Sequence, residues 1–143
     1  MSPSNLIIRD YFNPDFPQVQ ELWKATGIYT EERGDSPEII TRCNAHGGKF
    51  LVIEDTRSGK ICGTSWMSWD GRRIFLHHFA VAPEIQGRGW GRKLAEASLA
   101  FAREKGQPVK LEVHQDNLPA VKLYRSLGFR VFEGYDMYMI LDP

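Results

Sequence analysis

The stretch that decides the fold runs from Arg73 to Arg92 and reads RIFLHHFAVAPEIQGRGWGR. Its apolar residues from Ile74 to Val81 predict a buried strand. The strand ends at Pro83, because proline has no N–H group to give to a strand ladder. A long helix follows the glycine-rich turn, since apolar residues then recur at helical spacing at Leu94, Ala97 and Phe101. Strand, turn and helix form the frame for interpreting the rest of the chain.

The turn between this strand and this helix contains Gly87, Gly89 and Gly91. A helix interior disfavours each glycine by about 1 kcal/mol relative to alanine, so their presence favours a close approach of backbone to ligand. The first N–H groups of a helix have no internal partner and attract phosphate. Arg88 and Arg92 add positive charge beside them. The alternative is a plain strand-to-helix turn in which glycine supplies positive φ.

Length and charge limit the class of protein. A chain of 143 residues predicts a single domain, residues 1–143, with its own core. Lysine plus arginine and aspartate plus glutamate both number 18, which gives no support to nonspecific nucleic-acid binding. Neither a signal peptide nor an apolar stretch of about 20 residues is evident. We therefore expect a cytoplasmic protein without nucleic-acid or membrane partners, with Cys43 and Cys62 reduced, although one disulfide remains an alternative.

The residues before the key strand predict a meander preceded by two helices. Ser36-Pro37 is typical of a helix start, and Asn13 or Asp15 can cap an earlier helix that ends at Gly27. Ser58-Gly59 and Asp70-Gly71 are hairpin signals, so the second, third and fourth strands should be antiparallel neighbours. The first three strands are predicted at Leu6–Ile8, Phe50–Ile53 and Ile61–Trp69.

The residues after the glycine turn predict a long helix from Arg88 to about Lys105 and a fifth strand from Val109 to Val113. A helical crossover of this length suits a parallel neighbour of the fourth strand. A short helix capped by Asp116 or Asn117 and final strands at Phe129–Glu133 and Met137–Leu141 complete the pattern. The predicted fold class is α/β (α+β), with a mixed, mostly antiparallel sheet of six to seven strands, a parallel central pair formed by the fourth and fifth strands, and about four helices.

Two groups of residues resemble the GNAT family of N-acetyltransferases. Residues 81–83 and 86–91, VAP and QGRGWG, are similar to its acetyl-CoA signature Q/R-x-x-G-x-G/A. The second half of its pattern resembles LEV, Asn117, Ala120, LY and LGF, at residues 111–113, 117, 120, 123–124 and 127–129. The later part is most similar to the ribosomal-protein alanine acetyltransferase-like branch. The resemblance implies a single-domain fold whose sheet opens between the fourth and fifth strands.

This resemblance implies acetyl-CoA as cosubstrate and no metal. Pantetheine would pair with the backbone of the fourth strand like an added strand. The pyrophosphate would lie on the amides of the glycine turn, and Asn117 would hold the pantetheine arm from the other side. The predicted cofactor-binding residues are therefore Phe79, Ala80, Val81, Gln86, Gly87, Arg88, Gly89, Trp90, Gly91, Arg92 and Asn117.

An amine of lysine type has a pKa of about 10.4 and must lose a proton before it attacks a thioester. Glu112 is the candidate base, because it interrupts an apolar strand and the resembling branch has a glutamate there; it would act through a water. His114 lies on the same strand face and is the fallback. The alternatives are a solvated Glu112 or an ion pair with a basic group.

Tyr124 is the candidate acid for the leaving thiolate. It follows Asn117 by two helical turns, so the two side chains should share one helix face. In the resembling family a tyrosine here lies near the cofactor sulfur. The alternative is a core tyrosine whose hydroxyl is satisfied elsewhere.

Two further features complete the candidate site. His77 and His78 are adjacent in a strand, so we expect them to point to opposite faces and to hold no metal. The loop from Ile28 to Asp35 carries three acidic residues, which could attract a cationic amine or simply be solvated.

The sequence therefore predicts an enzyme that transfers acetyl from acetyl-CoA to a primary amine by direct attack in a ternary complex. The acceptor would be a small-molecule amine or a protein or peptide amine, and the protein a monomer or homodimer. A non-catalytic acyl-CoA-binding sensor on the same fold is one alternative. A Rossmann-type dehydrogenase is disfavoured, because its G-x-G-x-x-G spacing is absent and too few residues follow Val113.

Overall fold

The computed structural model describes residues 5–29, 31 and 34–143, so the predictions for Glu32 and Arg33 in the acidic loop lie outside it. Its contacts divide the chain into two compact units. We call residues 5–29 and 35–112 the sheet unit, and residues 31, 34 and 113–143 the C-terminal unit. Each is described by itself below.

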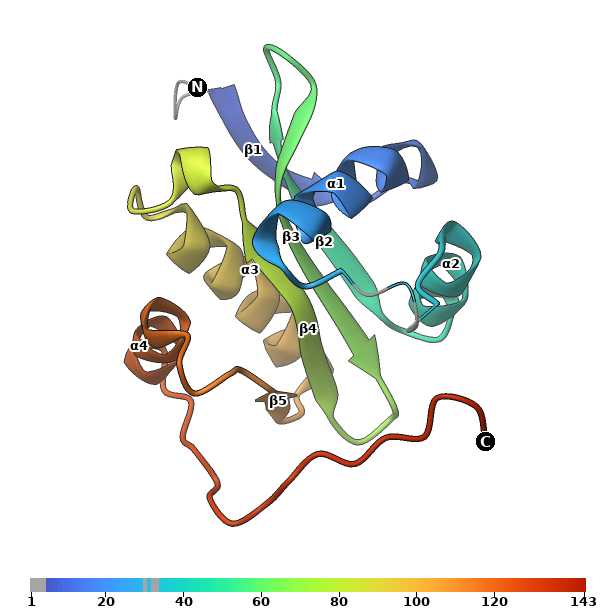
Figure 1. Cartoon of the computed structure of the whole chain (residues 1–143), viewed down its shortest axis with the longest axis vertical. Coiled ribbons are helices and arrows are strands. Elements are labelled where there is room, and N and C mark those ends of the chain that lie inside the picture. Colours follow the sequence, from blue (N-terminus) through green and yellow to red (C-terminus); the bar gives the residue numbers. More distant parts are fainter. Residues whose placement is uncertain (1–4, 30, 32–33) are drawn as a thin grey trace. The chain divides into compact units, whose positions relative to one another are not determined.

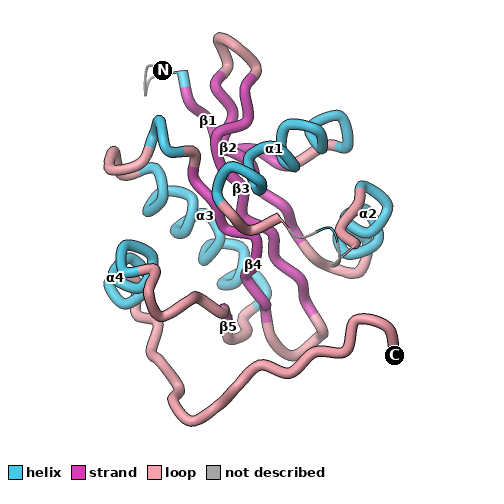
Figure 2. Tube along the Cα trace, viewed as in Figure 1, coloured by secondary structure: helices cyan, strands magenta, loops and turns pink. Residues whose placement is uncertain are grey.

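The sheet unit contains five strands and three α-helices (Figures 1 and 2). Its elements are β1 (Leu6–Asp10), η2 (Asn13–Asp15), α1 (Phe16–Thr26), α2 (Pro37–Ala45), β2 (Lys49–Asp55), β3 (Lys60–Trp69), β4 (Ile74–Val81), η4 (Pro83–Ile85), α3 (Trp90–Lys105) and β5 (Val109–Leu111).

The strands lie in the order β1-β2-β3-β4-β5. The pairs from β1 to β4 are antiparallel, and β5 is parallel to β4 after the α3 crossover. The predicted meander and parallel pair are thus confirmed. Helices α1 and α3 contact the same two strands, β3 and β4, and Figure 1 shows them on opposite faces of the sheet.

The core of the sheet unit is built on aromatic rings. Trp23 of α1 is fully buried, and its ring stacks on Phe50 of β2 and Trp66 of β3, with centroids 6.1 and 6.4 Å away. Val19 and Leu22 occupy the same buried face of α1 at helical spacing. Burial of this face fixes α1 over the strands that carry the site residues.

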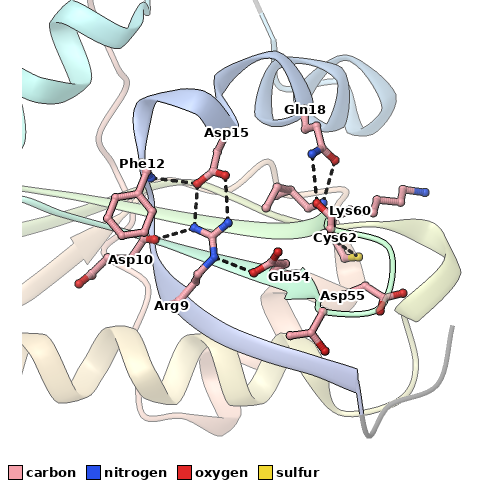
Figure 3. Close-up of polar contacts among 12 residues, drawn as sticks. Arg9, Asp10, Phe12, Asp15, Gln18, Glu54, Asp55, Lys60 and Cys62 are labelled. Atoms are coloured by element: carbon pink, nitrogen blue, oxygen red, sulfur yellow. Dashed lines mark hydrogen bonds and ion pairs between the residues drawn. The ribbon is translucent and has the colours of Figure 1, made fainter.

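The α1 and α2 termini follow from local chemistry. Ser36 caps α2 by accepting the Ile39 N–H, and Gly27 ends α1 at φ 80°, both as predicted. Asp15 occupies the N-cap position of α1, but its side chain makes no cap hydrogen bond there. The carboxylate instead accepts two bonds from Arg9, at 2.8 and 2.9 Å, and one from the N–H of Phe12, as Figure 3 shows.

Arg9 links the carboxylate of Asp15 to that of Glu54. Its Nε donates to Glu54 at 2.8 Å, so one guanidinium links β1, β2 and the start of α1 (Figure 3). Partial burial raises the pKa of Asp15, but the hydrogen bonds from Arg9 and Phe12 outweigh that effect and leave the pKa below its ordinary value.

The C-terminal unit is built on α4 (Leu118–Ser126). Asn117 caps this helix by accepting the Ala120 N–H, as predicted, and Gly128 follows its end at φ 100°. The Phe129 N–H bonds the carbonyl of Tyr124, and the two rings lie 5.7 Å apart edge to face. These contacts turn the chain back along α4.

The predicted final strands, Phe129–Glu133 and Met137–Leu141, are wrong in the structure. Residues after 128 form no strand, and Figure 2 draws them as loop to the C terminus. A strand exists only where its backbone bonds another strand, whereas the sequence pattern reports only the apolar side chains. Those side chains are exposed here: Val131, Phe132, Tyr135, Met137, Tyr138, Met139, Ile140 and Leu141.

We predict that Asp15→Asn lowers the free energy of unfolding by about 1–3 kcal/mol at pH 7, because it breaks a partly buried charged pair. The folded-state pKa of Asp15 is lowered, so its contribution is complete above the unfolded value and is lost as pH falls through the folded value. Chemical denaturation at pH 7 and pH 2.5 measures the difference, which should shrink at pH 2.5. The control is Asp10→Asn, which removes an exposed pair with Lys49. Equal losses in both variants would contradict the prediction.

Candidate active site

The glycine turn leaves backbone open to approach. Gly87 and Gly89 have φ of 77° and 87°, and a Cβ added to either would meet nothing within 4 Å. Helix α3 begins at Trp90 rather than at Arg88 as predicted, because the left-handed Gly89 cannot continue a right-handed helix. Gly89 caps α3 without a side-chain hydrogen bond. Gly89 therefore supplies no side-chain acceptor to the first N–H groups of α3.

Side chains around the turn define its edges. Trp90 is buried, so its role in the turn is packing, and Lys93 places its ammonium 4.3 Å from the Trp90 ring centre. Gln86 bends back to donate to the carbonyl of Val81 at 2.9 Å. Arg92 lies 3.5 Å from Glu96 in an exposed pair, and Arg88 is exposed. The turn thus combines exposed backbone with nearby cationic side chains.

The sheet opens directly before this turn. β4 pairs with β5 only over Ile74–Leu76, opposite Val109–Leu111. From His77 to Val81, β4 keeps β3 on one edge and has no strand on the other within the described residues. The predicted opening between the fourth and fifth strands is therefore present. Phe79, Ala80 and Val81, the predicted pantetheine-pairing residues, all lie on this open stretch.

A β-bulge at the opening makes one prediction from the sequence wrong, namely that His77 and His78 point to opposite faces of the sheet. Thr64 pairs with Ala80 and Trp66 with His77, so β4 carries one extra residue. His78 has φ 49°, the one positive value found among non-glycine residues in the described part of the chain. As a result the two imidazoles do not point to opposite faces. Their Nδ1 atoms lie 2.8 Å apart.

The bulge is held by side chains from other elements. Trp23 Nε1 donates to Thr64 Oγ1 at 2.9 Å, and this hydroxyl donates to the carbonyl of His78 at 2.8 Å. Asp35, from the predicted acidic loop, lies with Oδ2 3.0 Å from Nε2 of His78. Both side chains are mostly buried, with exposed fractions of 12% for His78 and 17% for Asp35. Burial, together with the neighbouring His78, lowers the pKa of His77 to about 3, so His77 is neutral at pH 7.

Sequence reasoning did not identify this cluster of three residues. Two consecutive histidines in an otherwise apolar strand were a usable signal, since imidazoles rarely fill such positions without a partner. Nothing in the sequence indicated the bulge, because the β4 residues that form it include neither glycine nor proline. Asp35 was noted only as part of an acidic loop.

The predicted base, Glu112, directly follows β5, which ends at Leu111 instead of Val113. Its side chain is exposed and makes no hydrogen bond or ion pair with the described residues. His114 is exposed, and its Nδ1 accepts the N–H of Asp116 at 3.1 Å.

The predicted acid, Tyr124, belongs to the C-terminal unit. It is buried, and burial raises the pKa of its phenol to about 12. Asn117 is exposed, and its Oδ1 is directed to the start of α4. The roles of Tyr124 and Asn117 toward a cofactor remain predictions.

The structure also bears on whether the chain has a separate cleft, a metal site, a disulfide or a membrane-spanning helix. A cleft of about 570 Å³ is lined by α1, the start of β3 and η4, and no predicted site residue lines it. The described residues hold no cluster of three or more metal-ligating His, Cys, Asp or Glu side chains. Cys43 and Cys62 are not joined in a disulfide, as expected. Among the described helices, none has the length and apolar character that crossing a membrane requires.

Comparison with known sequences gives one consistent result. The Acetyltransferase (GNAT) family matches residues 8–129. A mycothiol acetyltransferase of Thermobifida fusca is 39% identical over 99 residues, 62% of this chain and 31% of that protein. One from Tsukamurella paurometabola is 32% identical over 153 aligned positions, 96% of this chain and 52% of that protein. The N-alpha-acetyltransferase RimI of Mycobacterium tuberculosis is 51% identical over 55 residues, 38% of this chain and 34% of that protein. The chain thus spans about half or less of the length of these curated relatives.

Solved structures support the same fold. An acetyltransferase from Streptococcus agalactiae matches with a TM-score of 0.79 at 21% identity, covering 95% of this chain and 91% of that one. A Trypanosoma brucei acetyltransferase matches with a TM-score of 0.77 at 22% identity, covering 94% and 99%. At these identities the likeness concerns the fold alone, and it confirms the predicted fold class. The number of strands was predicted wrongly, because the described residues form a sheet of five strands and not of six to seven.

Proposed function

Because the chain belongs to the GNAT family of acetyltransferases, we propose that it transfers the acetyl group of acetyl-CoA to a primary amine. The amine would attack the thioester directly in a ternary complex. The observation that carries this proposal is the continuity of the open β4 edge with the glycine turn. One stretch of backbone, from His77 to Arg92, thereby offers groups for an extended arm and then for a diphosphate.

The residues present fit acetyl-CoA. Pantetheine carries amide groups that suit backbone pairing along Phe79–Val81, where no second strand lies among the described residues. The pyrophosphate suits the amides of Gln86–Arg92, where the absence of Cβ atoms at the glycines allows close approach. Asn117 is assigned to the pantetheine arm by the family resemblance. Acetyl-CoA supplies an activated acetyl group, and the protein supplies position and proton transfer.

Glu112 and Tyr124 remain our candidates for acid–base chemistry. An exposed carboxylate such as that of Glu112 can take a proton from an ammonium through a water. The raised pKa of Tyr124 keeps its phenol protonated at pH 7, so it can donate a hydrogen bond to a leaving sulfur. These roles would divide proton removal from the amine and stabilisation of the thiolate between two residues.

The acceptor is proposed only as a class. The relatives named above are called mycothiol acetyltransferase and N-alpha-acetyltransferase. The 51% identity over 55 residues to RimI supports our assignment to the alanine acetyltransferase-like branch, and the mycothiol relatives support a small-molecule amine. For either class we propose that the acetyl group is transferred to a primary amine.

We predict that the purified protein releases thiol from acetyl-CoA in the presence of a suitable amine. The panel should include a peptide with a free N-terminus, a lysine peptide blocked at its N-terminus, a polyamine, an aminosugar and an aminoglycoside. Tyr124→Phe should lower kcat about 100-fold and leave the Kd for acetyl-CoA nearly unchanged. Tyr138→Phe is the matched control, because that side chain is 91% exposed. Acetyl-CoA binding without turnover on any amine would favour the non-catalytic sensor, and full activity of Tyr124→Phe would remove Tyr124 from the mechanism.

We also predict that Gly89→Ala weakens acetyl-CoA binding about tenfold or more, because a methyl group would obstruct the approach of phosphate. The control is Gly71→Ala in the β3–β4 turn, which has a matched φ of 89° and equally open surroundings. Both variants should lose about 1 kcal/mol of stability through backbone strain. Calorimetric titration with acetyl-CoA separates them, and equal affinities would show that the turn does not hold the diphosphate.

A further inference from the structure

The side chains of Asp35, His78 and His77 lie in contact, in that order, at the bulge. Asp35 Oδ2 lies 3.0 Å from His78 Nε2, and His78 Nδ1 lies 2.8 Å from His77 Nδ1. We propose that this chain of side chains is a proton relay that accepts one of the protons lost by the acceptor amine, with His77 as the group that touches the amine. The proposal rests on the proposed function and adds a catalytic residue, His77, and two positioning residues to it.

The reaction requires more than one proton acceptor. A protonated primary amine carries three N–H bonds and the amide product carries one, so the nitrogen loses two protons. The first leaves before attack and is assigned to Glu112 through a water. The second leaves when the C–N bond forms and the nitrogen becomes cationic. The leaving thiolate takes up one proton, with Tyr124 as the proposed donor, so one proton passes to solvent overall.

The relay requires one arrangement of protons in the resting chain. A carboxylate only accepts, so in this arrangement Nε2 of His78 carries a proton and lies 3.0 Å from Asp35 Oδ2. Nδ1 of His78 is then a lone pair that accepts the Nδ1–H of His77. This leaves Nε2 of His77 as an acceptor. That nitrogen makes no hydrogen bond with the described residues and is not among the polar atoms that are fully buried without a partner.

The same geometry moves a proton without charging His77. As the N–H bond of the amine breaks, a new N–H bond forms at Nε2 of His77. The Nδ1–H bond of His77 breaks at the same time, and its proton bonds Nδ1 of His78. The positive charge then lies on His78, beside the carboxylate of Asp35. Burial disfavours a charged His77, and the relay avoids that state.

The position of the relay suits this role. His77 is the first residue of β4 after its pairing with β5 ends. Aromatic rings pack against the pair: the Trp66 and Trp23 rings lie 4.6 and 4.4 Å from His77 and His78. Among the described residues, the titratable groups that act on His77 are His78 and Asp35. A positive φ at His78 is the cost of bringing the two rings together.

The first test is independent of activity. Long-range ¹H–¹⁵N NMR of histidine-labelled protein at pH 7 reports which ring nitrogen holds each proton. We expect His77 protonated on Nδ1 and His78 on Nε2, with a scalar coupling across the Nδ1–Nδ1 hydrogen bond. His46→Gln, on an exposed side chain, assists assignment. A His77 protonated on Nε2 in the neutral resting protein would overturn the relay, since no acceptor would then remain.

The second test is kinetic and uses an amine that the wild-type protein acetylates. His77→Gln and Asp35→Asn should each lower kcat about tenfold or more and leave the Kd for acetyl-CoA within about twofold. The pH–rate profile of Asp35→Asn should change shape, because the charge on His78 loses its partner. Imidazole in the buffer should partly restore His77→Gly. Matched controls are His46→Gln and Asp10→Asn, whose side chains lie outside the chain.

The outcomes separate the two proposals. Folded His77→Gln and Asp35→Asn proteins with wild-type kcat would overturn the relay and leave the acetyltransferase proposal intact. Wild-type protein inactive on every amine would overturn the proposed function, and the relay with it. Thermal unfolding of each variant shows whether a loss of rate is a loss of fold, and rescue of His77→Gly by imidazole would exclude that explanation.

Discussion

The structure depends on the point at which β4 loses its second neighbour. In the described part of the chain, β5 bonds β4 only over Ile74–Leu76, and β4 continues to Val81 with β3 as its one strand neighbour. Backbone N–H and C=O groups require partners, so an open strand edge is a template for another extended chain. The same strand leads through η4 into the glycine turn at Gln86–Gly89 and then into α3. Opening, turn and helix start therefore follow one another along a single segment, whose order matches that of an extended arm attached to a diphosphate.

The bulge at His78 shapes this opening. A non-glycine residue at φ 49° costs about 1–2 kcal/mol, and such strain persists only where neighbours determine it. Here Trp23 bonds Thr64, Thr64 bonds the His78 carbonyl, and Asp35 contacts the His78 ring. The core helix α1 and the loop before α2 thus fix the backbone of β4 where it becomes open. The same contacts turn His77 and His78 toward each other, which links packing of the core to proton transfer in the site.

Much of this fold was predictable from local sequence, and the rest depends on contacts between distant residues. Ser58-Gly59 and Asp70-Gly71 indicated the hairpins, and the apolar run to Val81 indicated β4, because turn chemistry and side-chain period act within a few residues. The bulge could not be predicted, since it is set by Thr64 and Trp23 from other elements. The prediction of the final strands was wrong for the same reason. The apolar residues are present, but a strand needs a neighbouring strand to bond, and the apolar pattern does not specify one. Of the candidate site, the glycine turn and the opening were predicted correctly, and the imidazole pair was assigned the wrong orientation.

Amide hydrogen exchange, resolved by residue with and without saturating acetyl-CoA, tests the central claim most directly. If an extended arm and a diphosphate lie along this one segment, exchange should slow within residues 79–81 and 86–92. The β1–β2 pair, on the far side of the sheet order, should keep its rates. Acetyl-CoA binding that protects other segments, and leaves these residues at their ligand-free rates, would contradict the account.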